Sequence, residues 1–212
     1  VGGRDKRREG DPYFMWYDWM VGGWGGRNGR DGSNATAPMF GVGLAVQPAE
    51  GQERLCPVIT TQHTIRTDSA GPGEFRGGCG VEKGATLTEN DLTVMSYCCD
   101  RARSIAWGIN GGLPSLPHGV WLTREGADEQ DFLGAVFSSV EVREGDRFTR
   151  PSAGGGGFGD PLDRNPQSVL EDVADEYVSI ERAKIDYGVI VRLVDADLAE
   201  YELDLDATGA ER

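Results

Sequence analysis

Four consecutive glycines begin the segment that most constrains how this chain can fold. Residues 154–161 read GGGGFGDP. Glycine loses more backbone entropy on folding than other residues, so an ordered run needs a reason such as a positive φ or a close backbone contact. A flexible linker would continue in Gly and Ser, whereas an aromatic residue and a turn-forming Asp-Pro follow here. We therefore expect an ordered structural loop made of Gly154, Gly155, Gly156, Gly157, Gly159 and Asp160.

Glycine is also abundant elsewhere, with 32 glycines among 212 residues. This is about twice the average usage of about 7 %. No G-X-Y period is present, so a collagen triple helix is excluded. The many turns that these glycines imply favour short strands over a helical bundle, in one domain or two small ones.

Hydrophobic patterns predict strands over most of the chain. Alternation or short apolar runs lie at 13–21, 39–47, 58–66, 81–87, 91–98, 120–122, 136–142 and 189–194. The aromatic-rich run 13–21 reads as a buried strand, although its periodicity also fits a helix. The residues before them, 1–12, read as a polar loop. We expect 81–87 and 91–98 to form a pair of strands, and 143–146 to form a hairpin-like turn.

The pattern changes after the glycine run. Asn165 as N-cap and Pro166 at the first helical position predict a helix through Tyr177. Ser179 predicts a second helix, Ile180–Tyr187, that ends at Gly188, and the acidic tail 195–212 reads as a marginal helix. The expected fold is α+β, with a β-rich domain at 1–153 that carries glycine-rich loops. A glycine loop and a small helical cap follow at 154–212.

Charge and composition restrict the partners. The net charge is −14, which repels nucleic acid and anionic membranes, so neither is an expected partner. No signal peptide or long apolar span is found, and we expect a cytoplasmic protein. The first thirty residues are basic instead, and are either a solvated loop or a docking surface for an acidic segment or an anionic substrate.

Cysteines and histidines give little evidence of a reactive or metal site. Cys56, Cys79, Cys98 and Cys99 lack metal-type spacing and are too sparse for a disulfide framework, so we expect reduced, buried thiols. A zinc-type site needs three or four converging ligands. His63 and His118 stand in a strand and a loop, and we expect no metal in this chain.

Two further glycine-rich loops carry candidate substrate-binding residues. The loop GGWGGRNGRDG at 22–32 offers two arginines that can clamp a carboxylate or phosphate, beside bare glycine backbone. The alternative is an interface loop in which Arg30 and Asp31 pair locally. In DSAGPGEFRGGCG, at 68–80, the polar members either bind substrate or build a structural turn. The candidates are Gly25, Gly26, Arg27, Arg30, Asp31, Asp68, Ser69 and Arg76; no catalytic residue is assigned.

The glycine run itself is a poor nucleotide site. It lacks the Gly-Lys-Ser/Thr ending of a P-loop, and no G-x-G-x-x-G follows a clear strand-to-helix start. We expect it to pack structurally near an active site.

Five segments in this order resemble the C-terminal part of the hydantoinase B/oxoprolinase family. They are GGWGGRNGRDG, DSAGPGEFRGGCG, AWGINGG, AGGGGFGDPLDRNPQSVLEDV and VSIERAKIDYGVIV. The family includes B-type subunits of ATP-dependent hydantoinases and lactamases and related subunits of acetone and acetophenone carboxylases. The resemblance implies that this chain is incomplete, because the family's metal ligands lie in an N-terminal portion.

The resemblance implies partners and cofactors as well. We expect assembly with the N-terminal portion of the B-type subunit and with an ATP-binding A-type subunit. ATP and a divalent metal are then expected in those partner chains, with no cofactor in this one. Three functions stay open: ATP-dependent hydrolysis of a cyclic amide, ATP-dependent carboxylation of a ketone, and a non-catalytic scaffold. The aromatic cluster at 13–24 fits an aromatic ketone pocket and a hydrophobic core equally well.

Overall fold

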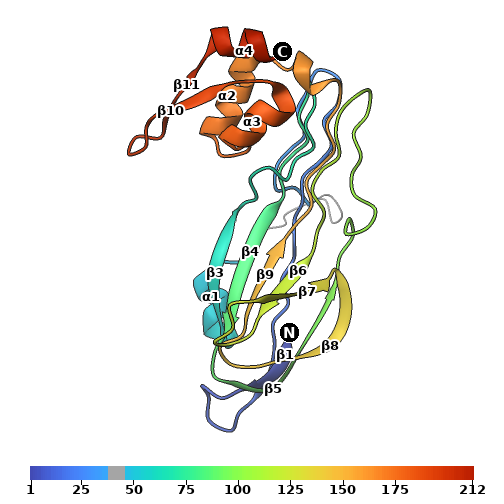
Figure 1. Cartoon of the computed structure of the whole chain (residues 1–212). Coiled ribbons are helices and arrows are strands. Elements are labelled where there is room, and N and C mark those ends of the chain that lie inside the picture. Colours follow the sequence, from blue (N-terminus) through green and yellow to red (C-terminus); the bar gives the residue numbers. More distant parts are fainter. Residues whose placement is uncertain (38–45) are drawn as a thin grey trace.

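The computed structural model describes residues 1–37 and 46–212. The molecule is elongated, with a β body at one end, extended glycine-rich segments in the middle and a helical unit at the other end (Figure 1). The expected α+β class is confirmed. The strand expected at 39–47 falls largely outside the described residues.

The first sheet of the β body has five antiparallel strands. In spatial order they are β3 (Val58–Ile65), β4 (Val81–Leu87), β9 (Arg147–Pro151), β6 (Val120–Thr123) and β7 (Gln130–Gly134). The alternation that predicted β3 is present, since Val58 faces the core and Ile59 faces solvent.

The second sheet has four antiparallel strands. Their order is β2 (Tyr13–Met15), β1 (Gly2–Asp5), β5 (Asn90–Cys98) and β8 (Val136–Val142). A short helix, α1 (Ala49–Leu55), lies beside β3. Strands β4 and β5 therefore belong to different sheets, and the expectation that they pair with each other was wrong. The turn at 143–146 forms, but it connects β8 and β9 across the two sheets and makes no hairpin.

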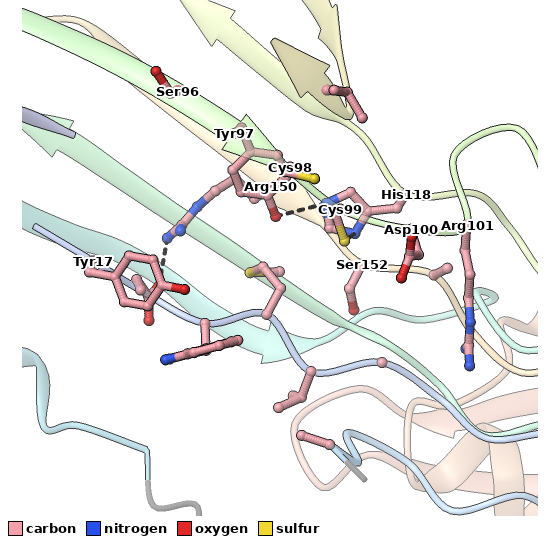
Figure 2. Close-up of a pocket in the computed structure, with 18 of the residues that line it drawn as sticks. Tyr17, Ser96, Tyr97, Cys98, Cys99, Asp100, Arg101, His118, Arg150 and Ser152 are labelled. Carbon is pink, nitrogen blue, oxygen red and sulfur yellow. Dashed lines mark hydrogen bonds and ion pairs between the residues drawn. The ribbon is translucent and has the colours of Figure 1, made fainter. Parts of the chain in front are cut away.

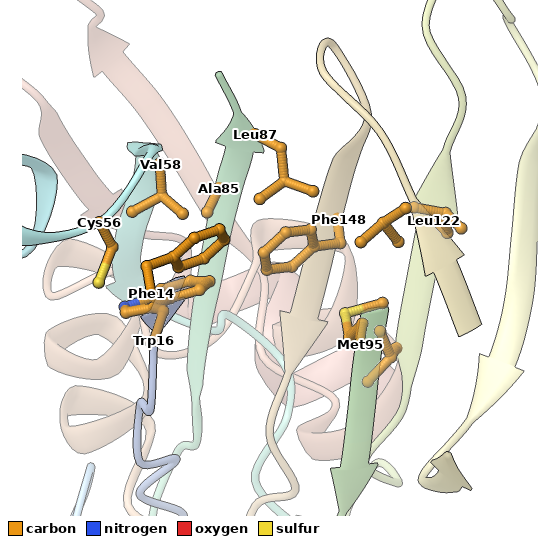
Figure 3. Close-up of a cluster of buried hydrophobic side chains, with 11 residues drawn as sticks. Phe14, Trp16, Cys56, Val58, Ala85, Leu87, Met95, Leu122 and Phe148 are labelled. Atoms are coloured by element: carbon orange, nitrogen blue, oxygen red, sulfur yellow. The ribbon is translucent and has the colours of Figure 1, made fainter. Parts of the chain in front are cut away.

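The main hydrophobic core is shared by both sheets (Figure 3). Phe14 and Met95 come from the four-stranded sheet, and Val58, Leu87 and Phe148 come from the five-stranded sheet. All five are at most 5 % exposed. Burial of side chains of this size stabilises the fold by about 1.5–3 kcal/mol each, so this core holds the two sheets together.

The middle of the molecule is a bundle of extended segments that we call the glycine bundle. It consists of residues 22–32, 69–80, 106–113 and 153–159. The central segment, 153–159, is hydrogen-bonded by its backbone to each of the others. Gly26 N donates to Gly156 O over 2.8 Å, Gly71 N to Gly155 O over 2.8 Å, and Gly159 N to Ile109 O over 3.0 Å. Segments far apart in sequence thus run side by side without forming regular strands (Figure 1).

Glycine is required in the bundle because the backbones leave no room for a side chain. A Cβ atom on Gly154, Gly155 or Gly157 would overlap a backbone carbonyl of a neighbouring segment. Here the close backbone contact, rather than a positive φ, explains the four consecutive glycines. Among them and their neighbours, only Gly159 has a positive φ, of 76°.

The C-terminal unit follows the bundle and has its own core. Its elements are η1 (Pro161–Asp163), α2 (Pro166–Ala174), α3 (Ile180–Tyr187), β10 (Val191–Asp195), β11 (Glu200–Leu203) and α4 (Leu205–Glu211). The predicted caps are confirmed: Asn165 accepts from Gln167 N, and Ser179 accepts from Arg182 N. Gly188 ends α3 in the left-handed region, at φ 60°.

Three local predictions were wrong in whole or in part. Residues 1–12 contain β1, a strand that forms because it lies between β2 and β5. The run 13–21 is a strand only over β2, and Met15 and Tyr17 are 71 % and 65 % exposed, so it is not a buried strand. The acidic tail is helical only in α4, and its first part forms strand β11 because it pairs with β10.

Candidate functional site

A cavity of about 980 Å³ lies beside the β body where it meets the glycine bundle. It is bounded by the segment 16–24, the end of β5, the start of β8 and residues 148–153. Its apolar lining side chains include Trp16, Trp19, Met95, Phe137 and Phe148. Ligand sites are typically mostly apolar cavities of about 300–1,000 Å³ with few polar groups, so this cavity is the candidate site.

Three side chains form a hydrogen-bonded row in the cavity wall (Figure 2). The Tyr97 hydroxyl lies 2.8 Å from His118 Nε2, and the Cys99 thiol lies 3.3 Å from His118 Nδ1. The Tyr97 ring also stacks between His118 and Phe137, at centroid distances of 5.5 Å and 6.0 Å. Tyr97 comes from β5, Cys99 follows that strand, and His118 precedes β6, so two adjoining strand ends position the row.

Burial keeps the three groups of this row uncharged. Burial, with help from the charges of Arg66 and Arg150, lowers the pKa of His118 to about 4. Burial also raises the pKa of the Tyr97 hydroxyl and of the Cys99 thiol. At neutral pH the row is therefore a neutral phenol, imidazole and thiol, which can donate and accept hydrogen bonds without bringing a charge into the cavity.

Two of the charged side chains that line the cavity, Asp18 and Arg150, form an ion cluster with Lys83. Asp18 accepts from Lys83 Nζ over 3.0 Å and from Arg150 over 2.9 Å. The guanidinium of Arg150 also lies over the rings of Trp16 and Phe148, 5.0 Å and 5.5 Å from their centroids. This buried ion cluster fixes the segment 16–19 against strands β4 and β9, and so shapes one wall.

The candidate residues of the 22–32 loop lie outside this cavity. Arg27 and Arg30 exchange two backbone hydrogen bonds of 2.9 Å, which makes a tight turn with Gly29 at φ 78°. Both arginine side chains are exposed, and neither has a side-chain partner among the described residues. Gly25 and Gly26 lead into the turn, and Gly26 is hydrogen-bonded to the central glycine segment. This turn stays a predicted anion-binding site.

Asp31 and Arg76 belong instead to a buried ion network that joins the glycine bundle to the C-terminal unit. Arg76 Nε donates to Asp172 over 3.0 Å, and Arg164 donates to both Asp172 and Asp31 over 2.8–2.9 Å. Burial raises the pKa of Asp172, against the effect of both guanidinium groups. Burial acts in the same sense on Asp31, but there Arg164 and Arg76 together outweigh it, and the pKa is lowered. The carboxylate of Asp31 pairs with Arg164 and not with Arg30.

Asp68 and Ser69 also bond to protein groups. The Asp68 carboxylate accepts from Ser179 N over 2.7 Å, at the start of α3. The Ser69 hydroxyl donates to Arg66 O and accepts from Gly80 N, and its side chain is fully buried. The structure therefore places the eight candidates in three places: the exposed turn, the ion network and this junction.

The predicted glycine loop borders the cavity at one end only. Arg101 lines the cavity and donates to Gly154 O over 3.2 Å and to Gly23 O over 2.7 Å. Gly155, Gly156 and Gly157 are buried in the bundle, and Asp160 accepts from Leu162 N to cap η1.

The row of Tyr97, Cys99 and His118 was missed by sequence reasoning. The sequence places Tyr97 and Cys99 at the end of a strand and His118 about twenty residues later, so spacing alone carried no signal. The expectation of four buried thiols also needs correction. All four cysteines are free, but Cys98 is exposed and Cys99 half-buried, because β5 lies at the cavity mouth.

The described residues do not fit a metal site. Among them, no three His, Cys, Asp or Glu side chains converge as metal ligands do. No helix in the described part of the chain is both long and apolar enough to cross a membrane.

Comparison with known proteins identifies the class. The family model described as Hydantoinase B/oxoprolinase matches residues 1–161. The chain therefore belongs to the hydantoinase B/oxoprolinase family, as the sequence resemblance indicated.

Two relatives of this chain are subunits of differently named enzymes. The chain is 31 % identical over 195 residues to the caprolactamase subunit beta of Pseudomonas jessenii, covering 90 % of this chain and 33 % of that protein. It is 28 % identical over 222 residues to the acetone carboxylase alpha subunit of Xanthobacter autotrophicus, covering 86 % and 28 %. The chain thus spans about a third of the length of these two relatives.

Solved structures support the same fold. The crystal structure of the ATP-dependent caprolactamase from Pseudomonas jessenii matches 99 % of this chain and 36 % of the caprolactamase chain, with a TM-score of 0.77 and 30 % identity. A nucleotide-free acetone carboxylase structure matches 99 % of this chain and 31 % of its own chain, with a TM-score of 0.81 and 24 % identity. The second likeness concerns the fold alone.

Proposed function

We propose that this chain is part of a hydantoinase-B-like subunit whose complex hydrolyses a cyclic amide with the use of ATP. The observation that carries the proposal is the 31 % identity to a caprolactamase subunit along 90 % of the chain. The largely apolar cavity, whose polar row is neutral, is consistent with a small uncharged substrate.

The proposal includes partners that supply what this chain lacks. An A-type subunit binds ATP and phosphorylates the substrate, and the remaining portion of the B-type subunit carries a divalent metal. The described residues offer no metal-ligand cluster, so no step is assigned to a metal here. A cytoplasmic location stays a prediction.

The alternative is a subunit of an ATP-dependent ketone carboxylase. The match to an acetone carboxylase alpha subunit favours it, and the uncharged row in the cavity suits a ketone as well as a lactam.

Product analysis of the whole complex with ATP separates the two reactions. Ring opening of a lactam or hydantoin without bicarbonate is expected for the hydrolase and would reject the carboxylase. Bicarbonate-dependent consumption of a ketone, with no ring opening, would reject the hydrolase. The purified chain alone is expected to be inactive in both assays.

The third candidate function is that of a non-catalytic scaffold, and substitutions in the exposed turn of Arg27 and Arg30 test it. If the turn only packs against a partner, Arg27→Ala and Arg30→Ala leave turnover intact. A drop of about a hundredfold with assembly preserved, equal to about 2.7 kcal/mol of transition-state stabilisation, would contradict the scaffold and support anion binding at the turn.

A further inference from the structure

We propose that the cavity beside β5 is a binding site for a neutral cyclic carbonyl compound, whose oxygen accepts a hydrogen bond from the Tyr97 hydroxyl. His118 and Cys99 act as positioning residues that leave this hydroxyl proton available to a stronger acceptor, the ligand oxygen. The class of ligand, a lactam or a similar cyclic amide, rests on the proposed function. The site itself rests on the geometry of the cavity.

The hydrogen-bond donors and acceptors of the row determine which proton a ligand can use. A neutral imidazole has one N–H group and one acceptor nitrogen. If His118 carries its proton on Nε2, it donates to the Tyr97 oxygen over 2.8 Å, and the Cys99 thiol donates to Nδ1 over 3.3 Å. The Tyr97 proton then has only the Cys99 sulfur, a weak acceptor, as a partner in the row, so a carbonyl oxygen of a ligand is the better acceptor. With the proton on Nδ1, the Tyr97 proton is used by the imidazole instead, so a carbonyl ligand selects the first arrangement.

The surroundings of the row favour an uncharged ligand. His118 stays neutral well below physiological pH, and Tyr97 and Cys99 stay neutral well above it. The nearby acid Asp18 is engaged by both Lys83 and Arg150. The row itself is thus uncharged, while Arg150 is paired with Asp18 and Arg101 donates to backbone carbonyls. A hydrogen bond from a neutral group suits an amide or ketone oxygen.

The walls beside the row fit a compact apolar ring. Phe137 stacks on Tyr97, and Met95 and Phe148 also line the cavity. A ring placed against these side chains loses water while its carbonyl keeps a hydrogen-bond partner. Small-molecule sites typically combine an apolar wall, which provides affinity, with a few polar groups that fix the orientation of the ligand.

Binding of ε-caprolactam to the full subunit in its complex, without ATP, tests the proposal. Calorimetry is expected to give a dissociation constant that rises about tenfold in Tyr97→Phe, as for the loss of one hydrogen bond from a buried ligand oxygen. Tyr17→Phe is the matched control, because Tyr17 lines the same cavity but is 65 % exposed and outside the row. It is expected to bind like the wild type.

The positioning role has its own test. Cys99→Ala is expected to weaken binding severalfold and Cys99→Ser to restore it, since a hydroxyl donates to Nδ1 as the thiol does. Cys98→Ser, one residue away and exposed, is the control. In ¹⁵N NMR spectra, with His118→Gln used for assignment, lactam binding is expected to shift the imidazole toward the Nε2–H tautomer. An unchanged tautomer would contradict the positioning role.

The outcomes separate this inference from the proposed function. Lactam affinity that is equal in wild type and in a folded Tyr97→Phe overturns the site, even if the complex opens lactams with ATP. Should Tyr97→Phe unfold, the Cys99→Ala and Cys99→Ser pair decides. Tyr97-dependent binding without any ATP-dependent ring opening sustains the site and rejects the hydrolase. Absence of lactam binding to the wild-type complex overturns the site directly.

Discussion

The glycine bundle and the cavity are neighbouring regions that use their polar groups in opposite ways. In the bundle, backbone N–H and C=O groups of four segments bond to one another, and a side chain on Gly155 would overlap a carbonyl. In the cavity, Tyr97 and His118 face an open volume of about 980 Å³. The glycine motif therefore provides shape, whereas the polar groups that line the cavity come from residues without a sequence motif.

The largest expected effect is a side chain placed inside the bundle. In Gly155→Ala the new methyl group meets the Trp24 carbonyl and the Gly25 nitrogen, so neither side can yield without breaking hydrogen bonds. We expect a loss of at least about 5 kcal/mol in the free energy of unfolding, enough to prevent folding. Urea titration followed by tryptophan fluorescence measures it.

A glycine outside the bundle provides the control. Gly209 lies in helix α4 with no atom near its would-be Cβ, so Gly209→Ala is expected to stabilise the chain by about 0.5–1 kcal/mol. A folded Gly155→Ala of near-normal stability would show that the bundle is looser than its contacts indicate.

The next effect concerns the ion network between the bundle and the C-terminal unit. Asp172→Asn removes the charge that Arg76 and Arg164 share, and leaves two buried guanidinium groups short of a partner. We expect a loss of about 4 kcal/mol, in the range for breaking a buried ion pair. The surface pair of Arg143 and Glu141 is the comparison, and Glu141→Gln is expected to cost less than about 0.5 kcal/mol. Equal losses would show that the network is not buried in solution.

We expect the contribution of the cavity residues to the free energy of unfolding to depend on pH. The contribution of the glycine bundle does not, because the bundle is held by uncharged backbone groups. Burial lowers the pKa of His118 to about 4, below the usual value of about 6.5 that applies in the unfolded chain. Between these values the unfolded state binds a proton that the folded state does not. The contribution of His118 to the free energy of unfolding is therefore fully present above about pH 6.5. It is lost as the pH falls to about 4, and the loss is at most about 3 kcal/mol.

Urea titrations at pH 7 and pH 4 measure this loss. Because carboxylates titrate in the same range, the effect of His118 is read from the difference between the stability losses of wild type and His118→Gln. The stability of His118→Gln is expected to depend less on pH. His63→Gln is the control, since His63 is exposed on β3 and is expected to change the profile less. Identical profiles for wild type and His118→Gln would show that water or a counter-charge reaches His118.

The sequence predicted elements well where the signal is local. Asn165-Pro166 and Ser179 mark the starts of α2 and α3, because capping acts through side chains next to the helix end. Strand β1 begins with two glycines and has no strand pattern, and it exists because β2 and β5 lie on either side of it. Pairing between distant segments decides such elements, so local patterns miss them.

The candidate site was less predictable for the same reason. Arg76 was noted as a polar residue in a glycine loop, but its partner Asp172 is 96 residues away. His118 is 21 residues from Tyr97 and 19 from Cys99, and only the adjoining ends of β5 and β6 bring them together. A sequence shows which groups are available, whereas the fold decides which of them meet.

The smallest effect tests how tightly the row itself is held. Tyr97→Phe keeps the ring that stacks between His118 and Phe137 and removes only the hydroxyl, so the loss is the net value of one hydrogen bond, about 1 kcal/mol. Thermal unfolding of wild type and variant without ligand measures it. A loss above about 3 kcal/mol would mean that the hydroxyl stabilises the fold, as the backbone hydrogen bonds of the bundle do. A small loss means that the hydroxyl is available to a ligand, and in this the cavity differs from the bundle.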